Sequence, residues 1–261
     1  MENKIFPNTT LQVFTIIFLS FILGSPILFL ERYYFTDFSQ DAIKTIYYIV
    51  FFLIIISVVH LINFRYKRRI TYSFNINNSI SLLPLLAVIL FTFQAGLNPL
   101  MSNVLNFAFG FKNNLTNPFD SIVILIGALI LAPILEEIFF RGSVLKGLLT
   151  SYSARKAIII SAIIFAAFHL NPSQIFGGLV LGLFFGWVYY KTKSLGLTIL
   201  LHFSANLFGL ISEYMRYKLS SITNDSIFNI YGSMSLYIIL ICLVLFAFTF
   251  HRLYQKWRLS I

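Results

Sequence analysis

Long apolar stretches separated by short polar segments constrain this chain more than any other feature of its sequence. Its 261 residues are 58% hydrophobic and only 11% charged, whereas about a quarter of the residues in a soluble domain carry a charge. A helix that crosses the hydrocarbon core of a bilayer needs about 20 apolar residues, and shorter ones occur in packed bundles. The pattern therefore predicts an all-α, polytopic membrane helical bundle, with residues 1–261 forming a single integral membrane domain.

The apolar stretches predict about eight transmembrane helices. We expect these helices at residues 10–30, 42–64, 79–98, 120–149, 155–171, 174–191, 195–212 and 233–251. The first stretch is too long for the apolar region of a signal peptide, and no small-residue cleavage site follows it. A loop with a short interfacial helix is expected at residues 99–119.

Lysine and arginine are distributed unevenly between the predicted loops. With the N-terminus inside, the inside segments hold Lys4, Arg65, Lys67, Arg68, Arg69, Lys146, Arg155, Lys156, Lys191, Lys193, Arg252, Lys256 and Arg258. The opposite side holds only Arg32, Lys44, Lys112, Arg216 and Lys218. Because cytoplasmic loops carry the excess of basic residues, both termini are predicted to face the cytoplasm.

The net charge of +10 fits basic loops that meet the anionic lipids of a bilayer. No nucleic-acid-binding motif accompanies this charge, so nucleic acid is not an expected partner. The abundance of Ile, Phe, Asn, Lys and Tyr is typical of an AT-rich genome. The expected location is therefore the cell membrane, as a multi-pass protein, and specifically the cytoplasmic membrane of a bacterium.

Glu136 and Glu137 are the acidic residues that lie well inside a predicted span. A central carboxylate costs about 2.5–3.5 kcal/mol on insertion, so such residues usually face the bundle interior and are functional. Glu137 and Arg141 are four residues apart, in the order that favours an ion pair. Glu136 is turned away by about 100° and has no such partner on its own helix. The spacing predicts a reactive Glu136 beside a structural ion pair, and the alternative is a charge cluster that only binds helices together.

Two histidines lie inside other predicted spans, each with a companion one turn away. Phe165 precedes His169 by four residues, and Asn206 follows His202 by four residues on the same face. Glu136 and His169 each lie roughly 20 Å from the cytoplasmic end of their helix, and His202 roughly 10–15 Å. These depths permit one polar constellation built from three helices.

The chemistry of such a constellation is amide hydrolysis. A glutamate beside a neutral imidazole can take a proton from water, and a histidine and an asparagine can donate hydrogen bonds to an oxyanion. Zinc is the alternative, because Glu136, His169 and His202 would make a three-ligand set, although the HExxH motif of helical zinc proteases is absent. We expect a mechanism without a metal or cofactor. The single cysteine, Cys242, is predicted to be a small buried apolar residue.

Three motifs occur in order along the chain. They are EExxxR at Glu136–Arg141, FxxxH at Phe165–His169 and HxxxN at His202–Asn206. This series resembles the motifs of the CAAX protease and bacteriocin-processing (CPBP, or Abi) family of membrane proteins. The resemblance covers residues 119–212, which it indicates as a catalytic core. Residues 1–118 hold the first three predicted helices and carry no such motif.

The resemblance implies an intramembrane endopeptidase on a helical bundle. By position, Glu136 and His169 would activate the water, and His202 and Asn206 would form the oxyanion site. The supporting residues would be Glu137, Arg141 and Phe165. Prenylated substrates are not expected in a bacterium, so the implied substrate is a peptide or a membrane protein.

Two other functions compete with peptidase activity. The first is a non-catalytic immunity or regulatory membrane protein on the same fold. The second is a transporter in which Glu136 or Glu137 carries protons. The paired half-sequences and repeated broken helices of many transporters are absent from the sequence, which argues against the second.

Overall fold

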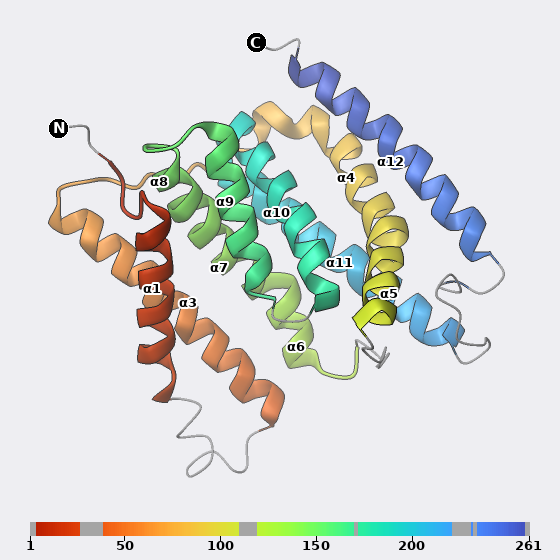
Figure 1. The fold of residues 1–261 in the computed structure, drawn as a ribbon, viewed down its shortest axis with the longest axis horizontal. Helices are drawn as coiled ribbons and strands as arrows, with labels where there is room; N and C mark the ends of the chain where they lie inside the picture. Colours follow the sequence, from red (N-terminus) through yellow and green to blue (C-terminus); the bar gives the residue numbers. More distant parts are fainter. Residues whose placement is uncertain are drawn as a thin grey trace.

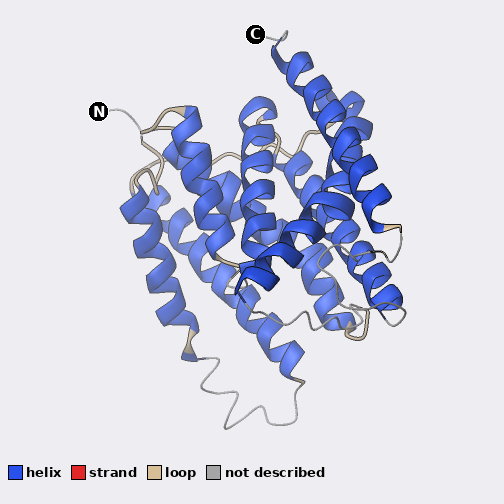
Figure 2. Ribbon diagram, turned by 45° about the vertical axis from the view of Figure 1, so that its right-hand side comes forward, coloured by secondary structure: helices blue, strands red, loops and turns tan. Residues whose placement is uncertain are grey.

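The computed structural model describes residues 4–26, 39–109, 119–169, 172–220, 231 and 234–258. Within these ranges the regular elements are all helices, as Figure 2 shows. The predicted all-α class is therefore confirmed.

Each of the predicted spans contains helix. The α-helices are α1 (Thr10–Gly24), α3 (Gln40–Arg65), α4 (Leu83–Thr92), α5 (Asn98–Phe109), α6 (Ile122–Ile126), α7 (Ala132–Phe139), α8 (Lys146–Leu148), α9 (Ala154–Ala167), α10 (Pro172–Thr192), α11 (Leu195–Ser220) and α12 (Ser235–Arg258). A 3-10 helix, η1 (Asn77–Leu82), precedes α4, and the π-helical turns are η2 (Phe93–Leu97), η3 (Gly127–Leu131) and η4 (Phe140–Leu145). The π turns lie inside longer continuous helices, so α4, η2 and α5 form one rod and the elements from α6 to α8 form another.

Six of these helical segments are long and apolar enough to cross a membrane. They are Gln40–Arg65, Ser79–Phe109, Ile122–Leu148, Gln174–Thr192, Leu195–Lys218 and Ser235–Trp257. The two other predicted spans hold shorter helices, α1 with 15 residues and α9 with 14. The chain therefore has the helices of a multi-pass membrane protein, and the crossing of the membrane by α1 and α9 stays a prediction.

A loop with a short interfacial helix is expected at residues 99–119, and the structure has helix as far as Phe109. This helix, α5, is continuous with α4 and η2, so the predicted break before it is wrong. Residues 110–118 lie outside the described part of the chain. Pro99 lies inside this continuous helix, although proline removes a backbone donor and clashes with the preceding turn. The π turn η2 ends two residues before Pro99, and its wider spacing lets the helix continue. Pro133 lies two residues after the π turn η3 in the same way.

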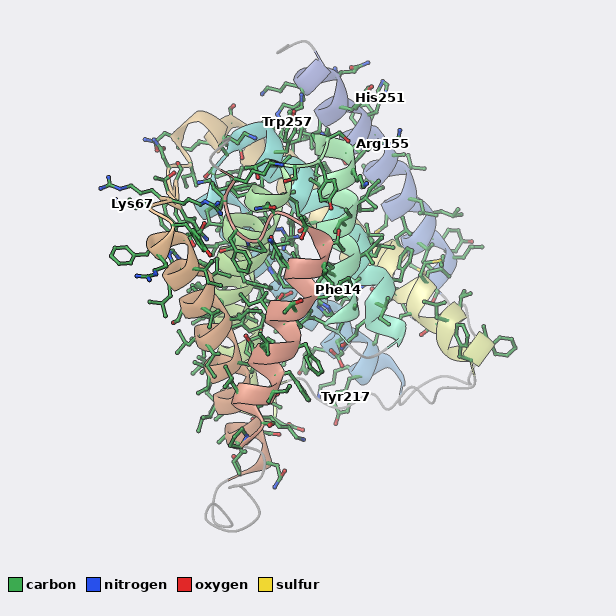
Figure 3. The ribbon with its side chains drawn as sticks, turned by 60° about the vertical axis from the view of Figure 1, so that its left-hand side comes forward. Phe14, Lys67, Arg155, Tyr217, His251 and Trp257 are labelled. Carbon is green, nitrogen blue, oxygen red and sulfur yellow. The ribbon has the colours of Figure 1, made fainter. Side chains whose placement is uncertain are left out.

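The helix ends nearest the predicted inside residues lie toward one end of the bundle. In Figure 1, α1 begins and both α3 and α12 end at this upper end. Lys67, Arg155 and Trp257 are labelled toward the same end in Figure 3, whereas Tyr217 lies toward the other. The separation of the two groups of loops is therefore present in the fold, and the side of the membrane that each group faces stays a prediction.

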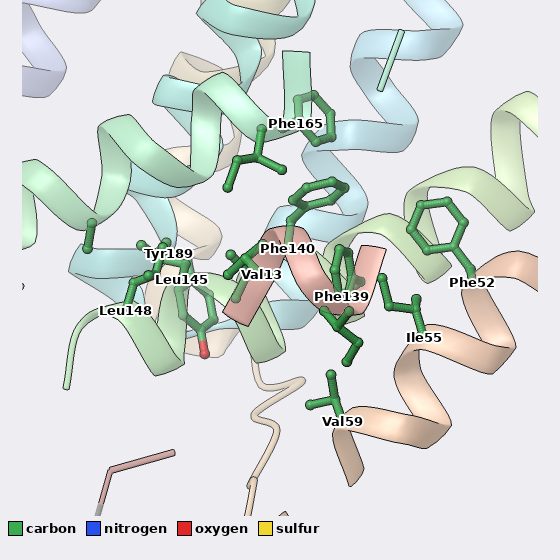
Figure 4. Packing of buried hydrophobic residues seen from close by; sticks show 14 of the residues in the cluster. Val13, Phe52, Ile55, Val59, Phe139, Phe140, Leu145, Leu148, Phe165 and Tyr189 are labelled. Atoms are coloured by element: carbon green, nitrogen blue, oxygen red, sulfur yellow. The ribbon is translucent and has the colours of Figure 1, made fainter. Parts of the chain in front are cut away.

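Aromatic packing fixes α7 and η4 between α3 and α9. Phe139 lies 6.0 Å from Phe52 of α3 between ring centroids, and Phe140 lies 5.1 Å from Phe165 of α9. All of these rings are fully buried, and Figure 4 shows how they interleave. Lipid tails are as apolar as these side chains, so van der Waals packing rather than removal from water holds such helices together. This packing sets the position of the two glutamates that precede Phe139 closely in the chain.

Candidate active site

The two glutamates lie on α7, a short α-helical segment that packs against both α3 and α11. π turns bound it on each side, η3 before it and η4 after it. Single π-helical turns inside α-helices frequently occur at functional sites, because they redirect side chains locally. The segment that carries Glu136 and Glu137 thus has the local geometry of a functional site.

Arg141 is the largest fully buried side chain of the described residues. Its Nη1 donates to Glu137 Oε1 at 2.8 Å, and its Nη2 donates to the carbonyl oxygen of Gly182 on α10 at 3.2 Å. The guanidinium carbon also lies 4.6 Å from the ring centroid of Phe165 and 5.4 Å from that of Phe185. The ion pair predicted for Glu137 and Arg141 is therefore present.

His202 of α11 lies between the two carboxylates. Its Nδ1 is 2.9 Å from Glu137 Oε1, and its Nε2 is 4.0 Å from Glu136 Oε2. The imidazole ring is buried against Phe165 and Phe185, with centroids 5.7 Å and 5.4 Å away. Because a carboxylate accepts hydrogen bonds, the contact with Glu137 places the Nδ1 proton between the two residues and leaves Nε2 directed toward Glu136.

Glu136 has one bound and one unbound oxygen. The Tyr48 hydroxyl of α3 donates a hydrogen bond to Oε1. Oε2 is buried and has no hydrogen-bond partner among the described residues. A buried carboxylate oxygen without a partner is costly unless a water or a ligand group binds it. A water or ligand group bound to this oxygen would satisfy it, and Nε2 of His202, 4.0 Å away, faces the same carboxylate.

Tyr48 was missed by sequence reasoning. It lies in an apolar span beside Tyr47, near the start of α3, where tyrosine is expected as an interfacial anchor. No motif or helical spacing relates position 48 to position 136, so only the packing of α3 on α7 could reveal the contact. The N-terminal region, which carries no motif, therefore contributes a side chain to the site.

His169 and Asn206 make separate contacts with the backbone. Nδ1 of His169 lies 3.1 Å from the carbonyl oxygen of Phe165, and Asn206 Nδ2 donates to the carbonyl oxygen of Ala128 in η3 at 2.7 Å. Within the described residues, no hydrogen bond joins either of them to Glu136. Phe165 lies beside both histidines, with its ring centroid 5.1 Å from that of His169. The aromatic ring thus links the two imidazoles by packing.

The described residues contain no group of three His, Cys, Asp or Glu side chains arranged to hold a metal ion. Zinc requires ligand atoms about 2.0–2.2 Å from the ion in a tetrahedral arrangement. Glu136, His169 and His202 do not form such a group. As they lie, these three residues do not fit a zinc site. Cys242 is buried, as predicted.

Residues 118–208 match a family model. Its description is type II CAAX prenyl endopeptidase Rce1-like. The resemblance to CAAX proteases is thereby confirmed over this segment, which contains Glu136, Glu137, Arg141, His169 and His202. The comparison with curated proteins gave no match, and neither did the comparison with solved structures.

Proposed function

We propose that this chain is an intramembrane endopeptidase in which Glu136 activates water to hydrolyse a peptide bond. The observation that carries the proposal is the unpaired Oε2 of Glu136, which lies 4.0 Å from Nε2 of His202 inside the bundle. This separation is too long for a direct hydrogen bond. A water molecule at ordinary hydrogen-bond distance from both atoms would bridge them, which is the position a nucleophile needs.

The charges of the cluster support an acid and a base side by side. Glu137 and Arg141 neutralise each other across 2.8 Å. The remaining pair, Glu136 and His202, has no net charge in two arrangements: an imidazolium with a carboxylate, or a neutral imidazole with a carboxylic acid. Because an uncompensated buried charge costs free energy, the favoured state has one proton shared between these two groups.

The proposed reaction starts from this arrangement, with an ionised Glu136 and a protonated His202. Glu136 takes a proton from the water as the water oxygen attacks the carbonyl carbon of the substrate. The resulting oxyanion accepts hydrogen bonds from the Nε2–H of His202 and from Asn206. The Asn206 amide has two N–H donors, and its bond to Ala128 uses one of them. Glu136 then gives its proton to the leaving nitrogen, and the carbon–nitrogen bond breaks.

His169 is proposed to assist Glu136 in proton transfer. A carbonyl oxygen can only accept, so the contact with Phe165 assigns the proton of His169 to Nδ1. The Nε2 atom of His169 then carries a lone pair that can receive a proton. Phe165 is proposed to hold both imidazoles in orientation, since it packs against each of them. Glu137 and Arg141 hold His202 and the local helix, and Tyr48 holds the carboxylate of Glu136.

The proposed substrate is a peptide bond in a peptide or a membrane protein, consistent with the apolar helices around the site and with the match to a CAAX-type endopeptidase. The proposed location is the cell membrane. The mechanism as proposed uses no metal or cofactor.

The experiment is a comparison of membrane proteomes with mapping of newly formed peptide termini. Cells would express the wild-type chain, Glu136→Gln or the control Glu213→Gln at equal levels. Glu213 is a partly buried carboxylate toward the other end of α11 from His202. New termini that require Glu136 but not Glu213 are expected, together with accumulation of an uncut precursor. Equal cleavage in Glu136→Gln would refute the role of Glu136, and no termini in any strain would favour the non-catalytic alternative.

A further inference from the structure

A second feature lies apart from Glu136 and His202. It is a cavity of about 680 Å³ between α4, α9, α10 and α12. Ile89, Phe93, Val180, Phe184 and Phe246 are among the apolar side chains that line it. None of the proposed catalytic residues contributes to its wall. The volume is in the range of about 300–1,000 Å³ that is typical of small-molecule sites.

Cationic groups lie at one end of this cavity. Arg155, in the first turn of α9, lines it and is exposed, and it has no ion-pair or hydrogen-bond partner among the described residues. Tyr190 also lines it, and Nζ of Lys193 lies 4.3 Å from the centroid of its ring. No acidic side chain lines the cavity. The end near Arg155 is therefore both polar and positively charged.

Aromatic side chains form the wall below that end. Trp187 lies 4.5 Å from Trp257 and 5.6 Å from Phe250 between ring centroids. Tryptophan and tyrosine gather where the hydrocarbon core meets the headgroups. In a bilayer, this arrangement would put Arg155 and Tyr190 at the headgroup level and the apolar part of the cavity at the level of the acyl chains.

We propose that this cavity binds one anionic phospholipid, with an acyl chain against α4, α10 and α12 and its phosphate on Arg155. The acyl chain matches the almost wholly apolar wall. A guanidinium group binds phosphate oxygens in a bidentate manner. A zwitterionic lipid would bring its own cation toward Arg155 and Lys193, so a lipid with net negative charge is favoured. Basic pockets between transmembrane helices recognise such headgroups.

The test uses the purified, delipidated full chain and native mass spectrometry. The probes are phosphatidylglycerol and phosphatidylcholine with identical acyl chains, added as an equimolar mixture. One phosphatidylglycerol per chain should be retained, with a preference of about tenfold over phosphatidylcholine, because Arg155 and Lys193 repel the choline cation, whereas the glycerol headgroup carries no positive charge. Arg155→Gln should abolish the preference, because it removes the charge and breaks no internal contact.

Matched controls separate this site from general attraction to a basic surface. Arg69→Gln removes an exposed cation among the predicted inside residues and should leave the preference unchanged. Val180→Phe fills the cavity and should reduce lipid retention severalfold, whereas Val244→Phe, on an exposed face of α12, should not. Loss of preference in Arg69→Gln to the same extent as in Arg155→Gln would overturn the proposal. Unchanged retention in Val180→Phe, or equal binding of the two lipids by the wild-type chain, would overturn it as well. Because the experiment measures lipid binding, its outcome tests this proposal independently of peptidase activity.

Discussion

The buried ion pair between Glu137 and Arg141 gives the sharpest prediction for stability. Arg141→Met keeps the approximate length of the side chain but removes the charge. The variant loses the contact at 2.8 Å with Glu137, the bond at 3.2 Å to the Gly182 carbonyl oxygen and the approach to Phe165. It leaves the Glu137 carboxylate without its cation in a fully buried position.

Removal of one partner of a buried ion pair costs about 3–5 kcal/mol, because the other charge stays buried and unpaired. Two features place the expected cost for Arg141→Met near the lower end of that range. Nδ1 of His202 lies 2.9 Å from the same oxygen of Glu137 and continues to donate to it. In addition, polar groups of a chain unfolded within the membrane also find partners, which reduces the difference between the two states. We therefore expect a loss of about 3 kcal/mol.

A double-mutant cycle distinguishes the ion pair from loss of packing. Glu137→Gln keeps an oxygen that accepts from His202 but leaves Arg141 uncompensated. The double variant should be more stable than the sum of the two single losses predicts, by about 1–3 kcal/mol. The assay is unfolding by sodium dodecyl sulfate in mixed micelles, followed by the fluorescence of Trp187 and Trp257. Arg69→Met, at an exposed cation after the end of α3, is the control and should change stability by less than about 0.5 kcal/mol. A loss below about 1 kcal/mol for Arg141→Met, or strict additivity in the cycle, would refute this account of the pair.

Three further predictions follow from particular contacts. Tyr48→Phe should lower kcat about tenfold with little change in KM, because it removes only the hydrogen bond to Glu136. Tyr47→Phe is the control, since the Tyr47 hydroxyl has no hydrogen-bond partner among the described residues. An equal effect of both variants would contradict the positioning role of Tyr48. Gly147→Ala should destabilise the fold by about 1–3 kcal/mol, because a Cβ there would overlap the carbonyl oxygen of Pro7. Gly127→Ala is the control: its Cβ would lie 3.5 Å from the nearest side-chain atom, and it should be neutral in the same unfolding assay. A neutral Gly147→Ala would disprove the close approach of Gly147 to Pro7. Peptidase activity should survive treatment with a chelator, and elemental analysis should find no stoichiometric zinc; one zinc per chain, with activity lost on its removal, would reverse the choice between the two mechanisms.

Helical periodicity predicted the parts of the site that lie within one helix. The spacing of Glu137 and Arg141 predicted their ion pair. The same geometry predicted that Glu136 has no ion-pair partner on its own helix. The approach of His202 to this helix was expected only from matching depth, since contacts between helices depend on which faces pack. Depth did not distinguish its two carboxylate neighbours: His202 makes its short contact with Glu137 rather than with Glu136.

The features that sequence reasoning missed depend on packing and on local departures from the ideal helix. The contact of Tyr48 with Glu136 joins positions 88 residues apart, so no local pattern contains it. The continuous helix through Pro99 depends on the π turn η2, which sequence periodicity does not indicate. Proline normally clashes with the preceding helical turn, and the inserted π turn accommodates it here.

The contribution of α3 changes how the catalytic core should be delimited. The family match covers residues 118–208, and the predicted core began at residue 119. Tyr48 lies well before both, yet it holds one of the two oxygens of Glu136 and thereby leaves the other available. Phe52, one turn later on α3, packs against Phe139 and sets the distance between α3 and α7. A chain that lacked α3 would keep every motif residue, but its Glu136 carboxylate would be free to rotate away from His202. The proposed chemistry therefore requires the N-terminal helices as well as the segment that carries the motifs.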